Sequence, residues 1–206
     1  MTHPAADRII SLYQDKAADW IRDRGAALRR HEGDWDEVVW LDRFTAGWPP
    51  GARVLDVGCG SGWPMGAALL ECGFKVVGLD ASPGLIAHAC QTLPHGDWRL
   101  GDMRLSLPDS AFHGVLAWHS LFHLTPEAQT HVLPVLAARV AEGGRLMFTA
   151  GPTHGEAIGE WRGEPLYHGS LAPEAYHRLL TEAGLTVEKG GDQGVWMARR
   201  AILSAK

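Results

Sequence analysis

Apolar residues at the start of the chain recur every three or four positions, with charged residues between them. The first of these positions are Ile9, Tyr13, Ala17 and Trp20. This period is typical of the buried face of an amphipathic helix. Gly33 interrupts the pattern, and the apolar residues within 40–44 predict a shorter second helix before the turn residues at 48–51. We therefore expect residues 1–50 to form a helical segment ahead of the main fold.

From residue 53 the pattern changes to short apolar runs that alternate with helical stretches. A run at 54–57 predicts a buried strand, and the glycine cluster after it leads into a helix at 64–72. The alternation continues with a strand at 75–79 and a helix at 85–93, a strand at 115–118 and a helix at 132–140, and a strand at 146–149. Such alternation implies crossover helices and a mostly parallel sheet covered on both faces. The sequence predicts a doubly wound α/β fold.

The end of the chain follows a different pattern. A helix at 176–183 is closed by Gly184, and two short strand patterns then flank the turn at 190–194. Two strands joined by a tight turn run antiparallel. We therefore expect a C-terminal antiparallel β-hairpin at one side of the parallel sheet.

Composition and charge argue against several classes of protein. A length of 206 residues suits one domain. The net charge is −5 and the basic residues are scattered, so we expect no nucleic-acid partner. We find no targeting segment and no apolar run of the roughly 18 residues that a membrane span needs. Three cysteines without a C-x-x-C pair fit a reducing, cytoplasmic location, and we expect no zinc or other metal site.

A glycine-rich loop follows the first predicted strand, where open α/β sheets bind ligands. Asp56 is followed by glycines at every second position, Gly58, Gly60 and Gly62, which lets a ligand lie close to the backbone. Asp80 ends the next strand, 24 residues after Asp56, where a carboxylate can bind both hydroxyls of a ribose. The third glycine of the dinucleotide pattern is absent, and no phosphate-binding G-K-[ST] follows. These features favour a nucleoside site.

The segment from Val54 to Gly62, Asp80, and the later Gly101-Asp102-Met103 together resemble the class I methyltransferase signature. The resemblance implies a mostly parallel seven-stranded sheet and S-adenosylmethionine as cofactor, with S-adenosylhomocysteine as product. It implies that the glycine loop holds the methionine part, that Asp80 binds the ribose, and that Asp102 and Met103 flank the adenine. The predicted cofactor residues are Asp56, Gly58, Gly60, Asp80, Ala81, Asp102, Met103 and Trp118.

The fourth strand ends next to two histidines. In the family that this chain resembles, the position after this strand commonly faces the transferring methyl group, so His119 is the predicted catalytic or substrate-orienting residue. Methyl transfer is an in-line displacement, and a base is needed only if the acceptor starts protonated. His123 lies four residues further on and shares a face with His119 if the segment is helical.

A long glycine-punctuated stretch follows the fifth strand, and we expect it to be an irregular substrate-binding loop. The predicted substrate residues are His123, His154, Glu156, Trp161, Tyr167 and His168. We expect the helical segment at 1–50 to act as a lid over them, 51–150 to be the cofactor-binding core, 151–170 the substrate loop, and 171–206 the C-terminal helix and hairpin. Together these form a single domain, 1–206.

Several alternatives stay open on sequence alone. Asp56 could serve only to brace the loop, His123 could be a structural imidazole, and Trp63 could cover the cofactor or simply pack. A module that binds S-adenosylmethionine without catalysis and a dinucleotide-dependent oxidoreductase are the rival functions. The Asn/Asp-Pro-Pro-aromatic motif of methyltransferases acting on nucleic-acid bases is absent. The acceptor atom and the oligomeric state are not determined.

Overall fold

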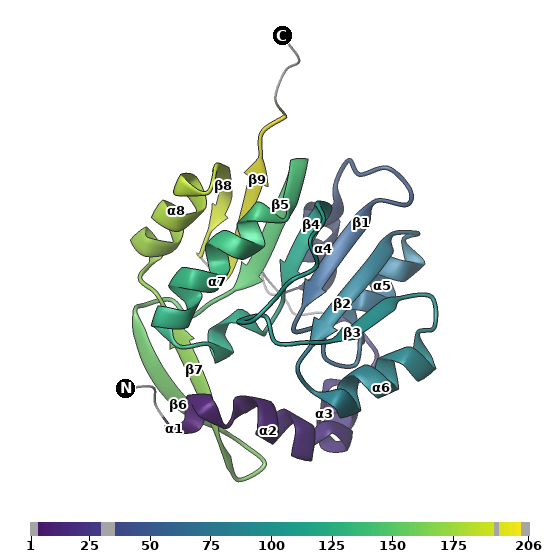
Figure 1. Cartoon of the computed structure of the whole chain (residues 1–206), viewed down its shortest axis with the longest axis vertical. Coiled ribbons are helices and arrows are strands. Elements are labelled where there is room, and N and C mark those ends of the chain that lie inside the picture. Colours follow the sequence, from purple (N-terminus) through teal and green to yellow (C-terminus); the bar gives the residue numbers. More distant parts are fainter. Residues whose placement is uncertain (1–3, 30–35, 192–193, 203–206) are drawn as a thin grey trace.

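A seven-stranded sheet forms the centre of the computed structural model, which describes residues 4–29, 36–191 and 194–202. The strand order is β3-β2-β1-β4-β5-β9-β8 (Figure 1). The strands are β1 (Arg53–Val57), β2 (Lys75–Asp80), β3 (Asp97–Leu100), β4 (Phe112–Ala117), β5 (Val140–Thr149), β8 (Leu185–Gly190) and β9 (Val195–Arg200). Strands β1 to β5 pair in parallel, and β9 runs antiparallel to both β5 and β8. The predicted fold class and C-terminal hairpin are confirmed.

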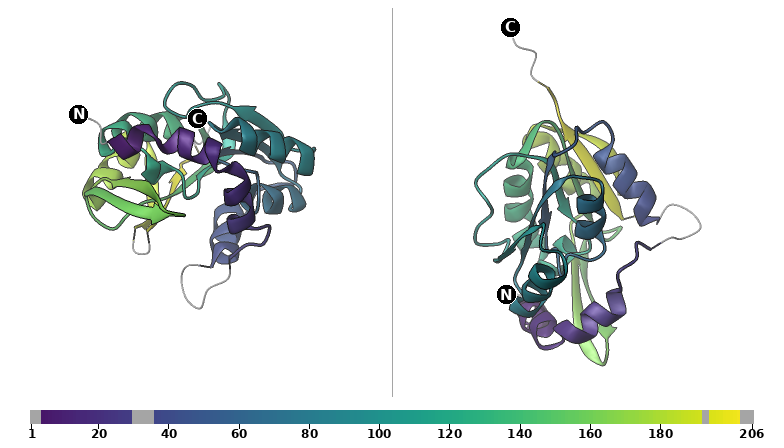
Figure 2. Two further views of the ribbon diagram at one scale, coloured as in Figure 1. Left: turned by 90° about the horizontal axis from the view of Figure 1, so that it is seen from below. Right: turned by 90° about the vertical axis from the view of Figure 1, so that its right-hand side faces the viewer.

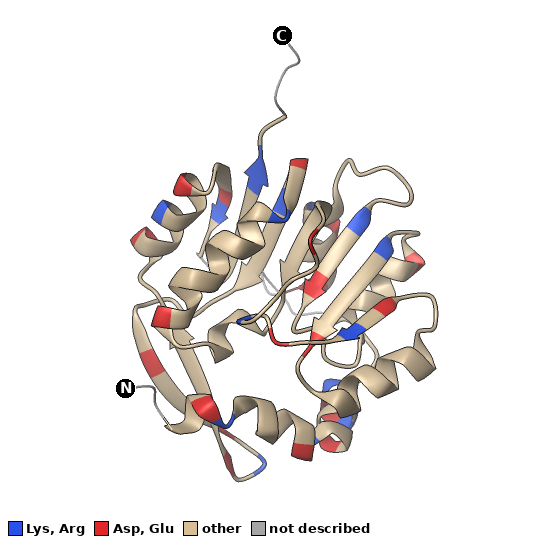
Figure 3. Cartoon of the chain, in the orientation of Figure 1, with Lys and Arg blue, Asp and Glu red and all other residues tan. Residues whose placement is uncertain are grey.

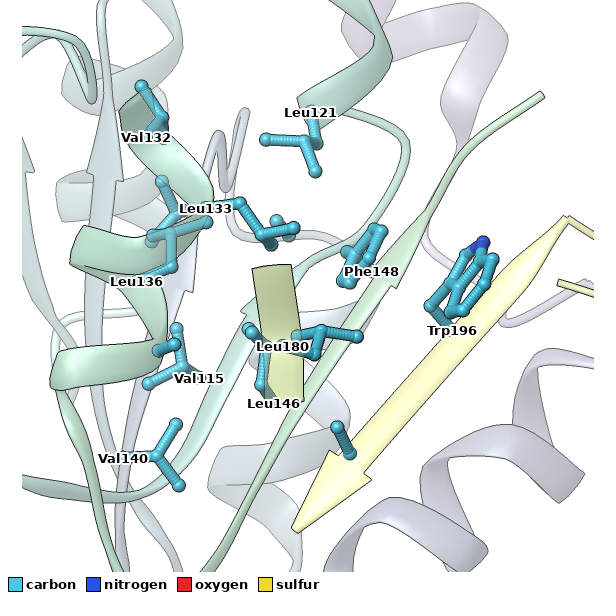
Figure 4. Packing of buried hydrophobic residues seen from close by; sticks show 14 of the residues in the cluster. Val115, Leu121, Val132, Leu133, Leu136, Val140, Leu146, Phe148, Leu180 and Trp196 are labelled. Carbon is cyan, nitrogen blue, oxygen red and sulfur yellow. The ribbon is translucent and has the colours of Figure 1, made fainter. Parts of the chain in front are cut away.

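Helices cover both faces of the sheet, each over its own apolar core. Successive residues of a strand point to opposite faces, so β1 sends Val54 into one core and Leu55 into the other. The first core lies under α4 (Glu37–Thr45), α5 (Met65–Glu71) and α6 (Pro83–Thr92). The second lies under α7 (Pro126–Ala138) and α8 (Pro173–Glu182), where Leu136 and Leu180 pack on Leu146 and Phe148 (Figure 4). Burial on both faces explains the continuous apolar runs of the strands.

Residues 4–24 form three short helices, so the prediction of one amphipathic helix at the start of the chain is wrong. They are α1 (Pro4–Asp7), α2 (Ile9–Asp15) and α3 (Ala17–Arg24), and Lys16 lies between α2 and α3 outside helical geometry, with φ −108° and ψ 20°. The breaks let the chain bend across the edge of the sheet at which β1 and β2 end (Figures 1 and 2). Gly33, the predicted breaker, lies outside the described residues.

Residues 155–170 form a β-hairpin, so the prediction of an irregular loop at 151–170 is wrong. Strand β6 (Gly155–Trp161) pairs antiparallel with β7 (Glu164–Ser170). The turn residues Arg162 and Gly163 have φ values of 54° and 79°, as a two-residue hairpin turn of the type I′ class requires. Most of β6 is exposed, so its sequence lacks the apolar alternation that marks a half-buried strand.

The hairpin and the N-terminal helices lie side by side. Ala6 and Ile9 pack on the buried Tyr167 of β7, which joins the start of the chain to the hairpin. Between α6 and β4 the chain returns through β3, and η1 (Leu121–His123) is one 3₁₀ turn after β4. Within the described parts of the chain, no helix has the length and apolar character needed to cross a membrane.

Candidate functional site

A cavity of about 400 Å³ lies at the carboxyl ends of β1, β2 and β4. Its walls include Gly58 of the glycine loop, Asp80 at the end of β2, His119 after β4, Trp20 of α3 and Trp161 of the hairpin. This edge is where open α/β sheets bind ligands. The volume is in the range of small-molecule sites. The cavity therefore joins the sheet, the N-terminal helices and the hairpin.

The glycine loop needs glycine at three positions for different reasons. Gly58, Gly60 and Gly62 all have positive φ, between 57° and 76°. A Cβ on Gly58 would lie 2.3 Å from Ser120 Cβ, and one on Gly62 would lie 2.9 Å from the ring of Trp98. Both glycines are thus required by packing. A Cβ on Gly60 would instead meet Trp20 of α3 at 2.6 Å, so the loop surface at Gly60 faces the N-terminal helices.

Two buried acids stand beside this loop. Asp80 accepts hydrogen bonds from Gly60 N and Ser82 N, both at 2.9 Å, and so ties the loop to the start of α6. Burial raises the pKa of Asp80 above its usual range. Asp56 is only 3% exposed, and burial together with the nearby Asp80 raises its pKa to about 7. A positively charged or hydrogen-bonding ligand would stabilise the ionised forms of both acids.

Asp102 and Met103 also line the cavity, together with Ala81. Arg104 donates to the Asp102 carboxylate through Nε at 3.0 Å and Nη2 at 2.6 Å. Burial raises the pKa of Asp102, but these hydrogen bonds outweigh it, so the pKa lies below the ordinary value. Asp102 is therefore a charged group already engaged by Arg104, and a ligand amine would have to share or displace that contact.

Trp118 and His119 follow β4 directly and both line the cavity. Trp118 Nε1 donates to Glu37 Oε1 at 3.0 Å, and His119 N donates to Thr149 Oγ1 at 2.8 Å. His119 has a positive φ of 53°, which turns the chain at the strand end. Burial lowers the pKa of His119 to about 4, so the imidazole is neutral at physiological pH.

His123 is held in one tautomer by two partners. Its Nδ1 lies 2.9 Å from the Tyr167 carbonyl oxygen, which can only accept, so Nδ1 carries the hydrogen. Nε2 therefore accepts from the Tyr13 hydroxyl at 2.8 Å. Burial lowers the pKa of His123 to about 4. His123 thus fixes the Tyr13 ring of α2 at the cavity wall.

Of the five predicted substrate residues at 154–168, two lie at the cavity and three lie outside it. Trp161 and His168 line the cavity, and Trp161 stacks on Tyr13 with ring centroids 5.9 Å apart. His154 and Glu156 are exposed and do not line it. Tyr167 is buried, and its hydroxyl donates to Glu156. Because strand residues alternate between faces, neighbours of Trp161 and His168 cannot all reach the same cavity.

Among the residues that sequence reasoning does not identify as site residues, Tyr13, Trp20 and Arg24 line the cavity, and Glu37 accepts hydrogen bonds from two lining residues, Arg24 and Trp118. Glu37 is 2% exposed and accepts hydrogen bonds from Arg24 Nη2, Arg29 N and Trp118 Nε1. Burial raises the pKa of Glu37, but these partners outweigh it and the pKa falls below its ordinary value. The partner Trp118 is 81 residues away in sequence, so no local motif signals the contact.

Comparison with known proteins identifies the family. Residues 54–144 match the family model described as a methyltransferase domain. Residues 54–144 are therefore identified as a class I methyltransferase domain. A 2-methyl-6-phytyl-1,4-hydroquinone methyltransferase of Synechocystis is 32% identical over 106 residues, which are 50% of this chain and 32% of that protein. The chain thus spans about a third of the length of that curated relative.

Solved structures share the fold of this methyltransferase. Magnesium protoporphyrin IX methyltransferase from Synechocystis, solved with bound S-adenosylhomocysteine, has a TM-score of 0.70 at 17% identity, covering 96% of this chain and 100% of that one. A sugar N-methyltransferase from Streptoalloteichus has a TM-score of 0.65 at 18% identity, covering 94% and 93%. At these identities the likeness concerns the fold.

The cavity of the methyltransferase fits an adenosyl cofactor. Asp80 stands at the strand end where a ribose binds, and the apolar Leu79, Leu85 and Met103 are available to a flat base. Gly60 presents backbone without a side chain to the cavity. In the described ranges, no cluster of three or more His, Cys, Asp or Glu side chains is arranged to hold a metal ion.

Proposed function

We propose that this methyltransferase transfers the methyl group of S-adenosylmethionine to a small-molecule acceptor by in-line displacement. The observation that carries the proposal is that one cavity is lined both by Gly60 and Asp80 and by His119, Trp161 and His168. Donor and acceptor would thus share one enclosed space, in which alignment supplies most of the rate enhancement.

Gly58, Gly60, Asp80, Ala81 and Met103 hold the cofactor in this proposal. When bound, the cofactor supplies an electrophilic methyl group on a sulfonium. Asp80 accepts hydrogen bonds from the ribose hydroxyls while its present contacts keep the glycine loop in place. Asp56 supports the glycine loop from the β1 side. Asp102 lies on the adenine side, where the adenine amine shares or displaces the contact between Asp102 and Arg104.

The acceptor binds on the side of the cavity formed by β4 and the hairpin. His119 orients the acceptor or takes its proton, and the neutral rings of His123, His168 and Trp161 form the walls. The compared proteins are named for a hydroquinone, a magnesium porphyrin and a sugar, which are all small molecules. This supports a small acceptor, and the net charge of −5 argues against a nucleic acid.

The test is isothermal titration with S-adenosylmethionine, S-adenosylhomocysteine and NAD. We expect the two adenosyl ligands to bind in the micromolar range and Asp80→Ala to weaken both by roughly 10- to 100-fold, because two hydrogen bonds to a charged acceptor are lost. Asp97→Ala is the matched control, since Asp97 does not line this cavity and pairs with Arg99 at the surface. Absent adenosyl binding, or a preference for NAD, would overturn the proposal. Formation of S-adenosylhomocysteine with a panel of acceptors separates an enzyme from a binding module.

A further inference from the structure

Arg24 is a charged residue of the cavity whose hydrogen bonds are incomplete. It ends α3, lines the cavity, and its side chain is 9% exposed. Nη2 donates to Glu37 Oε1 at 2.7 Å. Nη1 is buried and has no hydrogen-bond partner among the residues that the structure describes. A buried donor on a charged group is costly to leave unpaired, so Nη1 indicates a missing acceptor.

The acidic side chains around the cavity do not supply that acceptor. Asp23 is held by Arg162, Asp80 by two backbone N–H groups and Asp102 by Arg104. Glu37 already accepts three hydrogen bonds of 3.0 Å or less. Burial lowers the pKa of Arg24, and the charge of Glu37 opposes that shift only in part. A second anion entering the cavity would complete the pairing, and the guanidinium fork suits a carboxylate.

The position of α3 indicates which carboxylate. Trp20, one turn before Arg24 on the same helix face, places its ring over Gly60 of the glycine loop. The Glu37 oxygen that accepts from Arg24 also accepts from Trp118, so the guanidinium is fixed against the end of β4. Arg24 is thus held at the end of the cavity where the glycine loop and β4 meet.

We propose that Arg24 binds the carboxylate of the amino-acid part of S-adenosylmethionine through Nη1, with Glu37 as its positioning residue. The assignment rests on the proposed function. It gives α3 a direct contact to the cofactor.

The test compares two ligands that differ in this group. S-adenosylhomocysteine carries the amino acid, and 5′-methylthioadenosine has the adenosine and sulfur without it. Isothermal titration is done on the wild type, on Arg24→Gln, which keeps one N–H for Glu37, and on Arg22→Gln. Arg22 lies on the same helix, is 63% exposed and does not line the cavity, so it is the matched control.

We expect Arg24→Gln to weaken S-adenosylhomocysteine roughly 10-fold or more, as loss of a charge-assisted hydrogen bond does, and to leave 5′-methylthioadenosine unchanged. An equal loss for both ligands, or no loss for either, overturns the role of Arg24. If the single variant unfolds, the double variant Arg24→Gln/Glu37→Gln removes both charges of the pair. The ratio of its affinities for the two ligands then gives the same test. A wild type that binds neither ligand overturns the proposed function itself, a result distinguishable from the failure of Arg24 alone.

Discussion

His119 illustrates how its surroundings change the chemistry of one side chain. It follows the buried strand β4, and its side chain keeps 35% exposure toward the cavity. Its Nε2 is 4.0 Å from Glu37 Oε1, which favours the protonated ring, yet burial outweighs this and the pKa falls to about 4. At physiological pH the residue is a neutral imidazole able to accept a hydrogen bond or a proton. That is the state a proton-accepting or orienting group needs.

His119→Ala is expected to lower turnover of the methyl acceptor by about 100-fold, the usual contribution of a positioned base. The active form is neutral, so activity is lost only as pH falls through the lowered pKa of about 4. The wild type should therefore show no inflection from this group between pH 5.5 and 8. Steady-state rates against pH are the measurement, with the exposed His131→Ala of α7 as control. Unchanged turnover, or a wild-type inflection near pH 6.5 that is absent from His119→Ala, contradicts the role.

Two elements far apart in sequence, α3 and the β6–β7 hairpin, meet at the mouth of the cavity. Asp23 of α3 accepts from Arg162 Nε and Nη2, both at 2.7 Å, and from Trp161 Nε1 at 3.1 Å. The hydrogen bond from Arg162 is the main reason that the pKa of Asp23 falls to about 2. Figure 3 shows charged residues of both signs on α3 and at the hairpin tip. This contact joins two walls of the site.

Arg162→Gln should open this contact and speed release of S-adenosylhomocysteine, by roughly 3- to 10-fold, because affinity changes mostly through dissociation. The pair is exposed and screened by salt, so added NaCl should speed release in the wild type more than in the variant. Stopped-flow tryptophan fluorescence measures the rate, since Trp20 and Trp161 line the cavity. Arg178→Gln, in an exposed pair on α8, is the control. Equal rates and equal salt dependence in the two proteins would mean that the contact between Asp23 and Arg162 does not control release.

At the scale of the whole molecule, the sheet is stabilised by apolar cores on both faces and carries a buried acid at its functional edge. Asp56 lies at the end of β1 between these cores, 3% exposed. Burial and the charge of Asp80 raise its pKa from 3.8 to about 7. The folded protein therefore holds a proton on Asp56 that the unfolded chain releases between these values. The free energy of unfolding must lose part of its value as pH rises.

Asp56→Asn should remove this loss. We expect the stability of the variant relative to the wild type to increase by about 3 kcal/mol between pH 4.5 and pH 8. The sign follows from the raised pKa, because the wild type is destabilised as pH rises from 3.8 to about 7. Urea unfolding of both proteins at the two pH values measures the difference. A relative stability that stays constant, or that changes in the opposite direction, would mean that Asp56 is ionised at little cost.

The sequence by itself determined most of the alternating strands and helices between residues 53 and 149, the parallel sheet with its antiparallel end, and the loop from Asp56 to Gly62 with Asp80 beyond the next strand. These features are local. Each buried strand or helix needs an apolar pattern of its own period. Each glycine of the loop adopts a backbone conformation that residues with a side chain disfavour. Twelve of the fifteen predicted site residues line one cavity because they follow strand ends that meet at one edge, or lie on the hairpin that covers it.

The tertiary structure alone decided how the walls close over that edge. It divided the N-terminal segment at Lys16, folded 155–170 into a hairpin whose exposed strand has no readable period, and left His154, Glu156 and Tyr167 outside the cavity. It also brought Glu37 to Arg24 and Trp118. The physical reason is that these contacts join residues up to 139 positions apart, so they exist only after the elements have packed and leave no periodic signal in the chain.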